Sequence, residues 1–407
     1  MARRNDFIGG LDVGSSKTCA LVCQLGEGSK PVVLGWGVAE SKGWRKGVIT
    51  NLDAVVLSIK KAVEEAETKA GVPLDTAYVG VAGPHIKGVN SHGVTALGER
   101  PREVTLEDKG RVLQAAQGIS LPAGRELLHA WPQEFLVDSQ DSIREPMGMT
   151  GTRLEAHVHL VTASTTALES IVTAVNRAGI AFPEINGTVF EAMACAEACL
   201  APDERELGIA LLDIGGESSN LIVYQEGTVR HTASLPLGGE HFTNDIAVGL
   251  RTPIPEAEKV KRAWGERDAE RPADGMLEIP GVGDRPSRVV SYAQLGEIIE
   301  PRAIDLVELV EQELTRAGCR KQLGAGIALC GGGAKLGGLA LFAEQRFELP
   351  VRVARPAGLE KMGEELSDPA FATVVGLVCY GRRQRLMRET RERGWAGKLW
   401  SALSGRS

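Results

Sequence analysis

Apolar residues along this chain recur with two periods, one typical of strands and one typical of helices. Near residues 12 and 213, an apolar run ends in an Asp, passes through glycines and continues into a second strand-forming run. Each of these patterns predicts a β-hairpin. Further strands are expected at residues 127–137, 154–161 and 326–330. Helices are expected at residues 52–71, 106–118, 165–178, 188–200, 256–265 and 338–347, with a long helix from residue 293. This alternation predicts an α/β protein.

The two hairpins have nearly the same sequence at their tips, GLDVGSSK from residue 10 and LDIGGESS from residue 212. Glycines let backbone N–H groups approach an anion closely, and serines add donors. Two such tips that face each other would clamp a polyphosphate, and Asp12 and Asp213 would hold Mg²⁺ through its waters. An ordinary hairpin turn is the alternative for either copy alone. The candidate phosphate-binding residues are Gly14, Ser15, Ser16, Lys17, Gly215, Gly216, Glu217 and Ser218.

A third glycine-rich element follows the buried strand expected at residues 326–330. Gly331, Gly332, Gly333 and Ala334 precede a helix start, an arrangement in which a nucleotide can lie against the backbone. In the charged helix expected at residues 256–265, Glu258 and Lys261 are spaced to share one face. A solvated ion pair is the alternative interpretation of these two residues.

The order of these elements resembles the actin-like ATPase superfamily. Residues 148–162, 236–247 and 371–381 further resemble the bacterial cell-division protein FtsA, so the resemblance extends from Gly10 to the tail. It implies an actin-like two-lobe ATPase fold with an FtsA-type extra subdomain and a C-terminal amphipathic helix. The implied segments are the first-lobe core (1–83), the extra subdomain (84–162), first-lobe and interlobe helices (163–200), the second-lobe core (201–239), its insertion (240–317), the adenosine-loop part of that core (318–360), a return to the first lobe (361–381), a basic linker (382–394) and a membrane-targeting tail (395–407).

The same resemblance implies ATP and Mg²⁺ as cofactors and gives residues roles. Asp12 and Asp213 would act at the metal, and Glu191 would orient the attacking water, since positioning is much of catalysis in phosphoryl transfer. Glu258 and Lys261 match the ribose-facing helix, and residues 331–334 match the adenosine loop. The resemblance also places one further segment near the nucleotide, and its candidate residues are Gly238, Gly239, Asn244 and Asp245.

The second hairpin departs from the family pattern, because Glu217 and Asn220 replace a Gly and an Asp. A carboxylate at this tip would repel the γ-phosphate unless it turned away or met the Mg²⁺. ATP hydrolysis is therefore expected to be weak or absent, whereas binding through backbone N–H groups can persist.

The tail differs from the body in charge. Residues 382–407 contain eight basic and two acidic residues, a net charge of +6, so residues 1–381 carry −13 of the total of −7. An acidic body argues against nucleic-acid binding. On a helical projection of the tail, Trp395, Leu399, Trp400 and Leu403 share one face, which is typical of a helix lying in an anionic membrane surface. A short helix docked on the body is the alternative. Such a helix is expected to fold only on lipid.

The composition argues against a membrane span, a signal peptide, a disulfide framework and a zinc site. The chain has no apolar run near the roughly 20 residues of a membrane span, and no room for a signal-peptide segment before its first strand, so the body is expected in the cytoplasm. Seven cysteines without a C-x-x-C pair favour neither disulfides nor a zinc site. His157 and His159 share one face of a strand, but no third ligand is in view, so metal binding there is not expected.

The combined expectation is an ATP-binding protein that self-associates at the cytoplasmic face of the membrane at the division site. It would anchor FtsZ by binding the C-terminal peptide of FtsZ on residues 240–317, with Arg302 as a contact, and engage other division proteins. A PilM-type pilus-assembly ATPase is the nearest alternative and should lack the amphipathic tail. A sugar-kinase-type phosphotransferase would need a catalytic base between the lobes and has no use for that tail.

Overall fold

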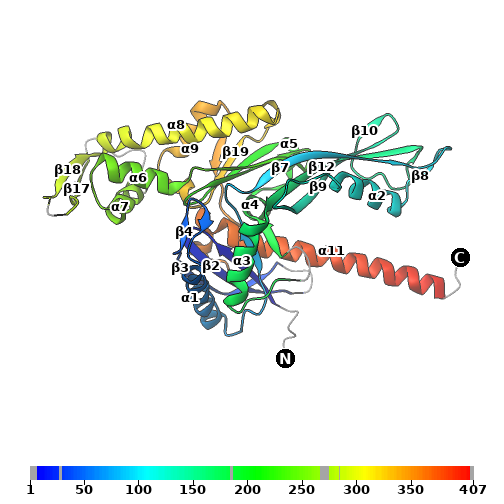
Figure 1. Cartoon of the computed structure of the whole chain (residues 1–407), viewed down its shortest axis with the longest axis horizontal. Helices are drawn as coiled ribbons and strands as arrows, with labels where there is room; N and C mark the ends of the chain where they lie inside the picture. Colours follow the sequence, from blue (N-terminus) through cyan, green and yellow to red (C-terminus); the bar gives the residue numbers. More distant parts are fainter. Residues whose placement is uncertain (1–6, 27–29, 184–186, 266–274, 284, 404–407) are drawn as a thin grey trace.

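The computed structural model describes residues 7–26, 30–183, 187–265, 275–283 and 285–403, and residues 391–403 by their backbone alone. Its long axis runs from a second-lobe insertion at one end to an extra subdomain at the other, with the first lobe below (Figure 1). Within the described residues, no helix is both long enough and apolar enough to cross a membrane.

Two five-stranded sheets form the lobes, and they share one topology. In the first lobe the order is β13-β6-β1-β2-β3, and in the second it is β16-β15-β14-β19-β20. In both, an antiparallel three-strand meander is extended by two parallel strands beside its first strand. The two hairpins with similar tips therefore occupy the same place in two sheets of the same topology. The first-lobe strands are β1 (Phe7–Val13), β2 (Lys17–Gln24), β3 (Val32–Glu40), β6 (Tyr78–Val81) and β13 (Thr188–Phe190), and the second-lobe strands are β14 (Ile209–Ile214), β15 (Ser219–Gln225), β16 (Thr228–Leu235), β19 (Ile327–Cys330) and β20 (Val351–Val353).

Helices cover the first-lobe sheet and reach the other lobe. They are α1 (Leu52–Ala70), α3 (Thr165–Arg177), α4 (Glu191–Cys199) and α11 (Ala372–Leu403), with a small hairpin of β4 (Trp44–Arg45) and β5 (Val48–Ile49) at the edge. The predicted first helix is confirmed as α1, which begins where Asn51 accepts a hydrogen bond from Ala54 N–H and ends at Gly71, with φ of 68°.

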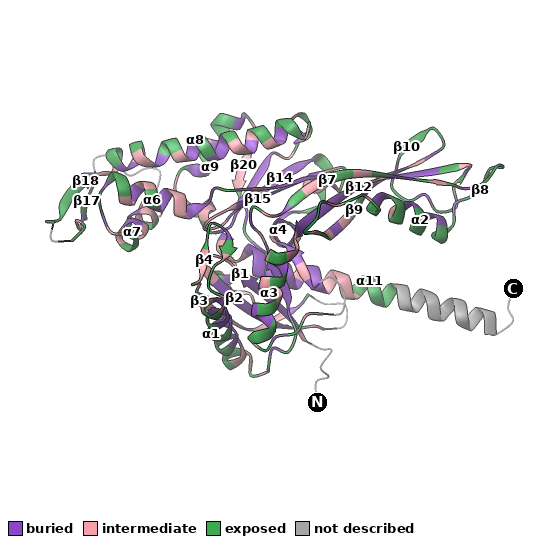
Figure 2. Cartoon of the chain, in the orientation of Figure 1, coloured by how far each residue is buried: buried purple, intermediate pink, exposed green. Residues whose placement is uncertain are grey.

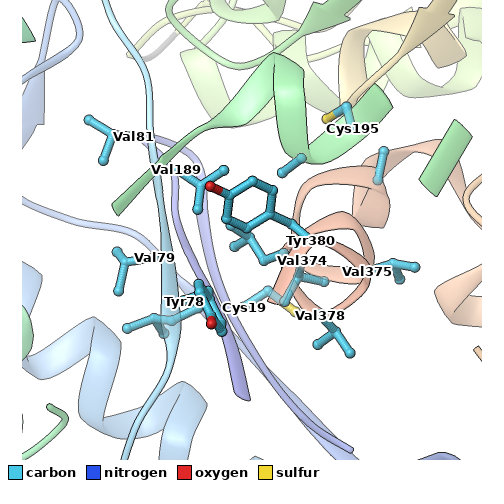
Figure 3. Close-up of a cluster of buried hydrophobic side chains, with 14 of the residues drawn as sticks. Cys19, Tyr78, Val79, Val81, Val189, Cys195, Val374, Val375, Val378 and Tyr380 are labelled. Atoms are coloured by element: carbon cyan, nitrogen blue, oxygen red, sulfur yellow. The ribbon is translucent and has the colours of Figure 1, made fainter. Parts of the chain in front are cut away.

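The core of the first lobe is formed where α11 packs on β1, β6 and α4. Figure 3 shows side chains of α11, including Val374 and Tyr380, beside Tyr78 and Val189 of the sheet. At Gly376 the two helices approach so closely that a Cβ atom would lie 1.8 Å from the Ala194 carbonyl oxygen. This contact explains why a glycine stands in the FATVVG segment.

The extra subdomain is a four-stranded antiparallel sheet covered by one helix, and it has its own core. Most buried residues lie inside the two lobes, and a smaller buried cluster lies between this sheet and its helix (Figure 2). Thr105 and Asp108 form a capping box at the start of the helix. The elements are β7 (Lys87–Ala96), β8 (Arg102–Glu103), α2 (Leu106–Gln117), β9 (Arg125–Val137), β10 (Gln140–Ile143), β11 (Thr150–Gly151) and β12 (Arg153–Ser164).

Residues 240–317 of the second lobe contain a hairpin of β17 (Met276–Ile279) and β18 (Arg288–Ser291), and the predicted long helix is confirmed as α8 (Tyr292–Arg316). The other helices after the interlobe region are α5 (Pro202–Leu207), α6 (Gly239–Gly249), α7 (Ile254–Gly265), α9 (Leu339–Phe347) and α10 (Gly363–Leu366), with 3₁₀ turns η2 (Arg320–Gln322), η3 (Gly332–Lys335) and η4 (Pro369–Phe371).

Two parts of the chain differ from the sequence-based expectation. The helix predicted from residue 188 begins at Glu191, because residues 188–190 form β13, whose buried Val189 and Phe190 pair in parallel with β6. Helix α11 continues through the predicted basic linker, residues 382–394, to Leu403, so the tail backbone is helical where a helix was expected only on lipid. The side chains of Trp395, Leu399, Trp400 and Leu403 lie outside the described residues, so their membrane role stays a prediction.

Candidate nucleotide site between the two lobes

The two predicted hairpins are confirmed, and their tips face each other. Gly14 N–H donates to the Lys17 carbonyl at 3.1 Å, and Gly215 N–H donates to the Ser218 carbonyl at 2.9 Å, so both tips close in the same way. A Cβ atom on Gly216 would lie 2.8 Å from Ser15 Oγ. The residues around the two tips therefore meet where the lobes join.

The third glycine-rich loop packs against the second hairpin. Gly331 has a φ of 80°, and a Cβ there would lie 2.4 Å from Asp213 Oδ1, so only glycine fits. Gly333 is equally close to Ile214. Gly332 differs, because it is exposed and a Cβ atom placed on it would lie 4.0 Å from its nearest neighbour, Ala370 Cβ. This loop can therefore approach a ligand at Gly332.

Three carboxyl groups gather at the junction. Asp12 and Asp213 stand at the ends of β1 and β14 and are almost fully buried. Burial raises the pKa of Asp12, while the charge of Lys17 opposes that rise. Burial, with the charge of Asp12, raises the pKa of Asp213 to about 7. Burial, followed by the charges of Asp12 and Asp213, raises the pKa of Glu191 well above its usual range. A hydrated Mg²⁺ is the kind of ion that such oxygen ligands fit.

Lys17 connects the first hairpin with the segment that precedes α11. Its ammonium donates to the Ala370 carbonyl and lies 3.9 Å from the ring centroid of Phe371. The neighbouring Pro369 carbonyl accepts a hydrogen bond from Gly331 N–H at 3.0 Å. The 3₁₀ turn η4 therefore contacts both the first hairpin and the third loop.

The start of α6 holds the second hairpin from behind. Gly239 N–H donates to the Gly215 carbonyl and Glu240 N–H to the Gly216 carbonyl, both at 2.8 Å. A Cβ on Gly238 would lie 2.5 Å from that Gly216 oxygen. Gly238 and Gly239 are thus brought to the hairpin, but as its support rather than with free donors.

Among the described residues, Asn244 and Asp245, the other two members of this family segment, make no hydrogen bond or ion pair with the hairpins. Asn244 is exposed on α6. Asp245 faces α8, where it pairs with Arg302, with Nε to Oδ2 at 2.7 Å.

The Glu258–Lys261 ion pair links two helices and is not merely a solvated pair on an exposed face. Lys261 Nζ lies 2.7 Å from Glu258 and donates to the Gly239 carbonyl at 2.9 Å and to Thr243 Oγ1 at 2.8 Å. Burial raises the pKa of Glu258, but hydrogen bonds from Lys261 and Thr243 outweigh it and leave the pKa lowered. The pair therefore fixes α7 against the start of α6, which supports the second hairpin.

The carboxylate of Glu217 is directed to the opposite lobe. It accepts hydrogen bonds from Lys46 N–H at 2.7 Å and from Gly47 N–H at 2.8 Å. Lys46 and Gly47 have φ of 52° and 71° and form the two-residue turn between β4 and β5, as in the turns that suit hairpins. Glu217 itself needs no positive φ. Of the two outcomes left open by the sequence, the carboxylate turning away is the one observed.

The Lys46–Gly47 turn is a site feature that the sequence analysis missed. Its signal was the Lys-Gly pair between the short runs Trp44-Arg45 and Val48-Ile49. The contact with Glu217 spans 171 residues for Lys46, so periodicity could not reveal it.

Asn220 lies directly opposite Asp213 in the β14–β15 ladder. Its side-chain hydrogen bond to Asp213 works against the effects that raise the Asp213 pKa, and its Oδ1 accepts from Ser234 Oγ at 3.0 Å. An Asp at position 220 would place another carboxylate beside Asp213. The Asn in place of the family's Asp therefore removes a charge from beside Asp213.

We expect the double variant Glu217→Gly with Asn220→Asp to hydrolyse ATP faster than the native chain. The change frees the interlobe tip and restores a carboxylate beside Asp213, and each well-placed electrostatic group is worth about 10²–10³ in rate. Phosphate release at saturating ATP measures the effect, with Glu226→Gly, at an exposed turn at the far end of β15, as the control. Brisk release from the native chain that Glu191→Ala leaves unchanged would contradict these roles.

Asp213 also belongs to a buried cluster with two thiols. Donor atoms of Cys195, Asp213 and Cys330 all lie within 4.8 Å of one another, the one such group of three among the described residues. Burial raises the pKa of Cys195 to about 12, and burial also raises that of Cys330. Protonated thiols do not ligate metals and Mg²⁺ prefers oxygen, so these cysteines form the apolar wall behind Asp213.

Comparisons with known proteins agree with this geometry. Residues 210–376 match the family model described as cell division protein FtsA, and residues 83–162 match the SHS2 domain inserted in FtsA. The chain is 41% identical over 380 residues to the cell division protein FtsA of Pseudomonas aeruginosa, covering 93% of this chain and 90% of that protein. The chain belongs to the FtsA family.

Other FtsA proteins and solved structures extend the comparison. The FtsA proteins of Escherichia coli K12 and Bacillus subtilis are 34% and 36% identical, each over 93% of this chain and over 90% and 84% of those proteins. A chain of the PilM–PilN type IV pilus biogenesis complex superposes with a TM-score of 0.64 at 18% identity, covering 92% of this chain and 98% of that one. MreB5 of Spiroplasma citri bound to ADP superposes with a TM-score of 0.56 at 15% sequence identity, and the match covers 96% of this chain and 99% of that one. The actin-like fold predicted from the sequence is confirmed.

Proposed function

We propose that this FtsA-family chain binds ATP with Mg²⁺ between its lobes. The support is the meeting of the three glycine-rich loops around Asp12, Asp213 and Glu191. When bound, Mg²⁺ would supply charge neutralisation to the phosphates. The chain's own groups would bind and orient: backbone N–H groups of the hairpin tips would cradle the phosphates, and the open face of Gly332 would admit the adenosine.

Within this proposal, turnover is slow. Burial and the charges of Asp12 and Asp213 raise the pKa of Glu191, which disfavours the ionised carboxylate that a general base needs. Glu217 is occupied by the first lobe and cannot hold Mg²⁺ in this conformation. The nucleotide then acts mainly as a structural ligand that joins the lobes.

We further propose that the chain self-associates at the cytoplasmic face of the membrane at the division site, anchors FtsZ there and engages other division proteins. The observation that carries this is the 41% identity to a curated FtsA over nearly the whole chain. The basic tail with its Trp-rich face supports membrane attachment. The PilM-type alternative has no such support, because a likeness at 18% identity speaks for the fold alone.

Co-sedimentation with anionic liposomes tests the proposal. The full chain is mixed with vesicles and a labelled peptide of the FtsZ C-terminus, with and without ATP. We expect the chain to sediment with vesicles, to carry the peptide with it, and to do so more completely with ATP because assembled copies bind multivalently. Peptide that stays in the supernatant while the chain sediments would contradict the anchoring role.

The Arg302→Glu variant is expected to weaken binding of that peptide. Arg302 pairs with Asp245 and with Asp305, and the hydrogen bond to Asp245 raises its pKa, so an acidic peptide must share this guanidinium. Reversing the charge leaves like charges facing each other, a cost of several kcal/mol. Fluorescence anisotropy gives the affinity.

Arg316→Glu is the matched control for this prediction. It reverses a charge of the same kind in the last turn of α8, where Arg316 pairs with Glu313. Thermal melting of both variants checks the fold. Equal peptide affinity for the native and Arg302→Glu chains would remove Arg302 from the binding site.

A further inference from the structure

Two histidines face each other across neighbouring strands of the extra subdomain. In the β7–β12 ladder His92 is the direct partner of His157, and their ring centroids are 5.1 Å apart. Their side chains are 43% and 40% exposed, so a dissolved ion can reach both rings.

This pair differs from the one that the sequence suggested. His159 shares a strand face with His157, but it is buried and hydrogen-bonded to Asn90 Oδ1 at 2.6 Å and to Thr232 Oγ1 at 2.9 Å. Its two ring nitrogens are therefore occupied. The second imidazole beside His157 comes instead from a strand 65 positions earlier, which only the sheet register reveals.

Each ring of the cross-strand pair is oriented by a carboxylate through one nitrogen. His92 Nε2 lies 2.5 Å from Glu155 Oε2, and His157 Nδ1 lies 3.0 Å from Glu134 Oε1. In the described part of the chain, His92 Nδ1 and His157 Nε2 have no hydrogen-bond partner. A ring that donates one N–H to a carboxylate and presents the other nitrogen is the usual form of a metal-ligating histidine.

The charges around the pair are balanced before any ion arrives. Glu155 also pairs with Arg153 at 2.8 Å, and Glu134 lies 3.7 Å from Arg230 of β16, in the second lobe. The site therefore lies where the extra subdomain meets the second lobe. An ion that draws Glu134 closer to His157 would compete with this Arg230 contact.

We propose that His92 and His157 bind a divalent transition-metal cation of the Zn²⁺ and Cu²⁺ class, with water completing its coordination and Glu155 and Glu134 orienting the rings. Imidazole suits these ions, whereas Mg²⁺ and Ca²⁺ prefer oxygen ligands. This site is separate from the carboxylates at the interlobe junction and does not depend on nucleotide binding.

Zn²⁺ calorimetry on the full chain without a histidine tag or nucleotide tests the proposal. Loss of a carboxylate behind a ligating histidine costs about 10–100-fold in metal affinity, so Glu134→Gln should lower Zn²⁺ affinity by about that factor. His92→Ala and His157→Ala remove a ligand and should lower it further. His231→Ala, which removes another His–Glu pair, is the control and should change nothing.

Electron paramagnetic resonance of bound Cu²⁺ identifies the ligands directly. The native chain should show hyperfine coupling to two imidazole nitrogens, and each single histidine variant to one. Circular dichroism confirms that the variants fold. Zn²⁺ affinity that survives in the His92→Ala, His157→Ala double variant, or a Cu²⁺ spectrum without nitrogen coupling, would overturn the proposal.

Discussion

Replacing Gly332 with Trp is expected to abolish Mg-ATP binding without disturbing the fold. Gly332 is exposed and has open space where a side chain would begin, unlike Gly331 and Gly333, which are packed against β14. A Trp at position 332 therefore fits the free protein but fills the place proposed for adenosine. Calorimetric titration with Mg-ATP measures the loss. Gly110→Trp is the matched control, because Gly110 is equally open but lies on α2 in the extra subdomain.

Asp12→Asn tests the part of the same site that we propose to hold Mg²⁺. The amide keeps the shape of the carboxyl group but removes the charge, so Mg-ATP should bind much more weakly than to the native chain. Because the charge of Asp12 raises the pKa of Asp213 and of Glu191, both pKa values should fall in this variant. Asp213 should then ionise below its native pKa of about 7, which titration by NMR can follow. Unchanged ATP affinity in both Gly332→Trp and Asp12→Asn would refute the clamp.

The double variant Trp395→Glu with Trp400→Glu is expected to release the chain from anionic liposomes. Each large apolar side chain contributes roughly 1.5–3 kcal/mol when fully buried, and an interfacial helix buries it in part. The new acids also face an anionic leaflet, which repels them and offsets the attraction of about 1 kcal/mol that each nearby basic residue contributes. Sedimentation with vesicles measures the release, and raising the salt should weaken native binding.

The control for the tail is a pair of equal changes on the body. Leu57→Glu with Leu106→Glu replaces two exposed apolar residues, 55% and 63% exposed, by acids. We expect this variant to sediment as the native chain does, and both double variants to melt at the native temperature. Vesicle binding that is indifferent to the tail changes and to salt would remove the tail as the anchor.

The parts of the fold that the sequence predicted are those with a local signal. The hairpins at Asp12 and Asp213 repeat a short pattern, and α1 and α8 have regular apolar spacing, so the hairpins, these helices and the glycine loops followed directly. The start of α4 was placed three residues early, because Val189 and Phe190 suit a buried strand and a buried helix equally well.

The parts that escaped prediction depend on distant partners. Glu217 meets a turn about 170 residues away, Arg302 meets Asp245 across 57 residues, and His92 meets His157 through the register of a sheet. The sequence shows which charged and polar residues could form a site. Only the folded structure shows which other groups these residues contact.

Helix α11 joins two regions that the proposed function treats separately. Its buried first half packs on α4 through Gly376, and α4 begins at Glu191; its backbone then runs on as one helix to Leu403. At 1.5 Å per residue, its 32 residues make a rod of about 48 Å. Whatever holds the far end of this rod also sets the tilt of the body above it. Under the proposed membrane attachment, the helix held by the surface would therefore be the same helix that packs beside α4, which begins at Glu191.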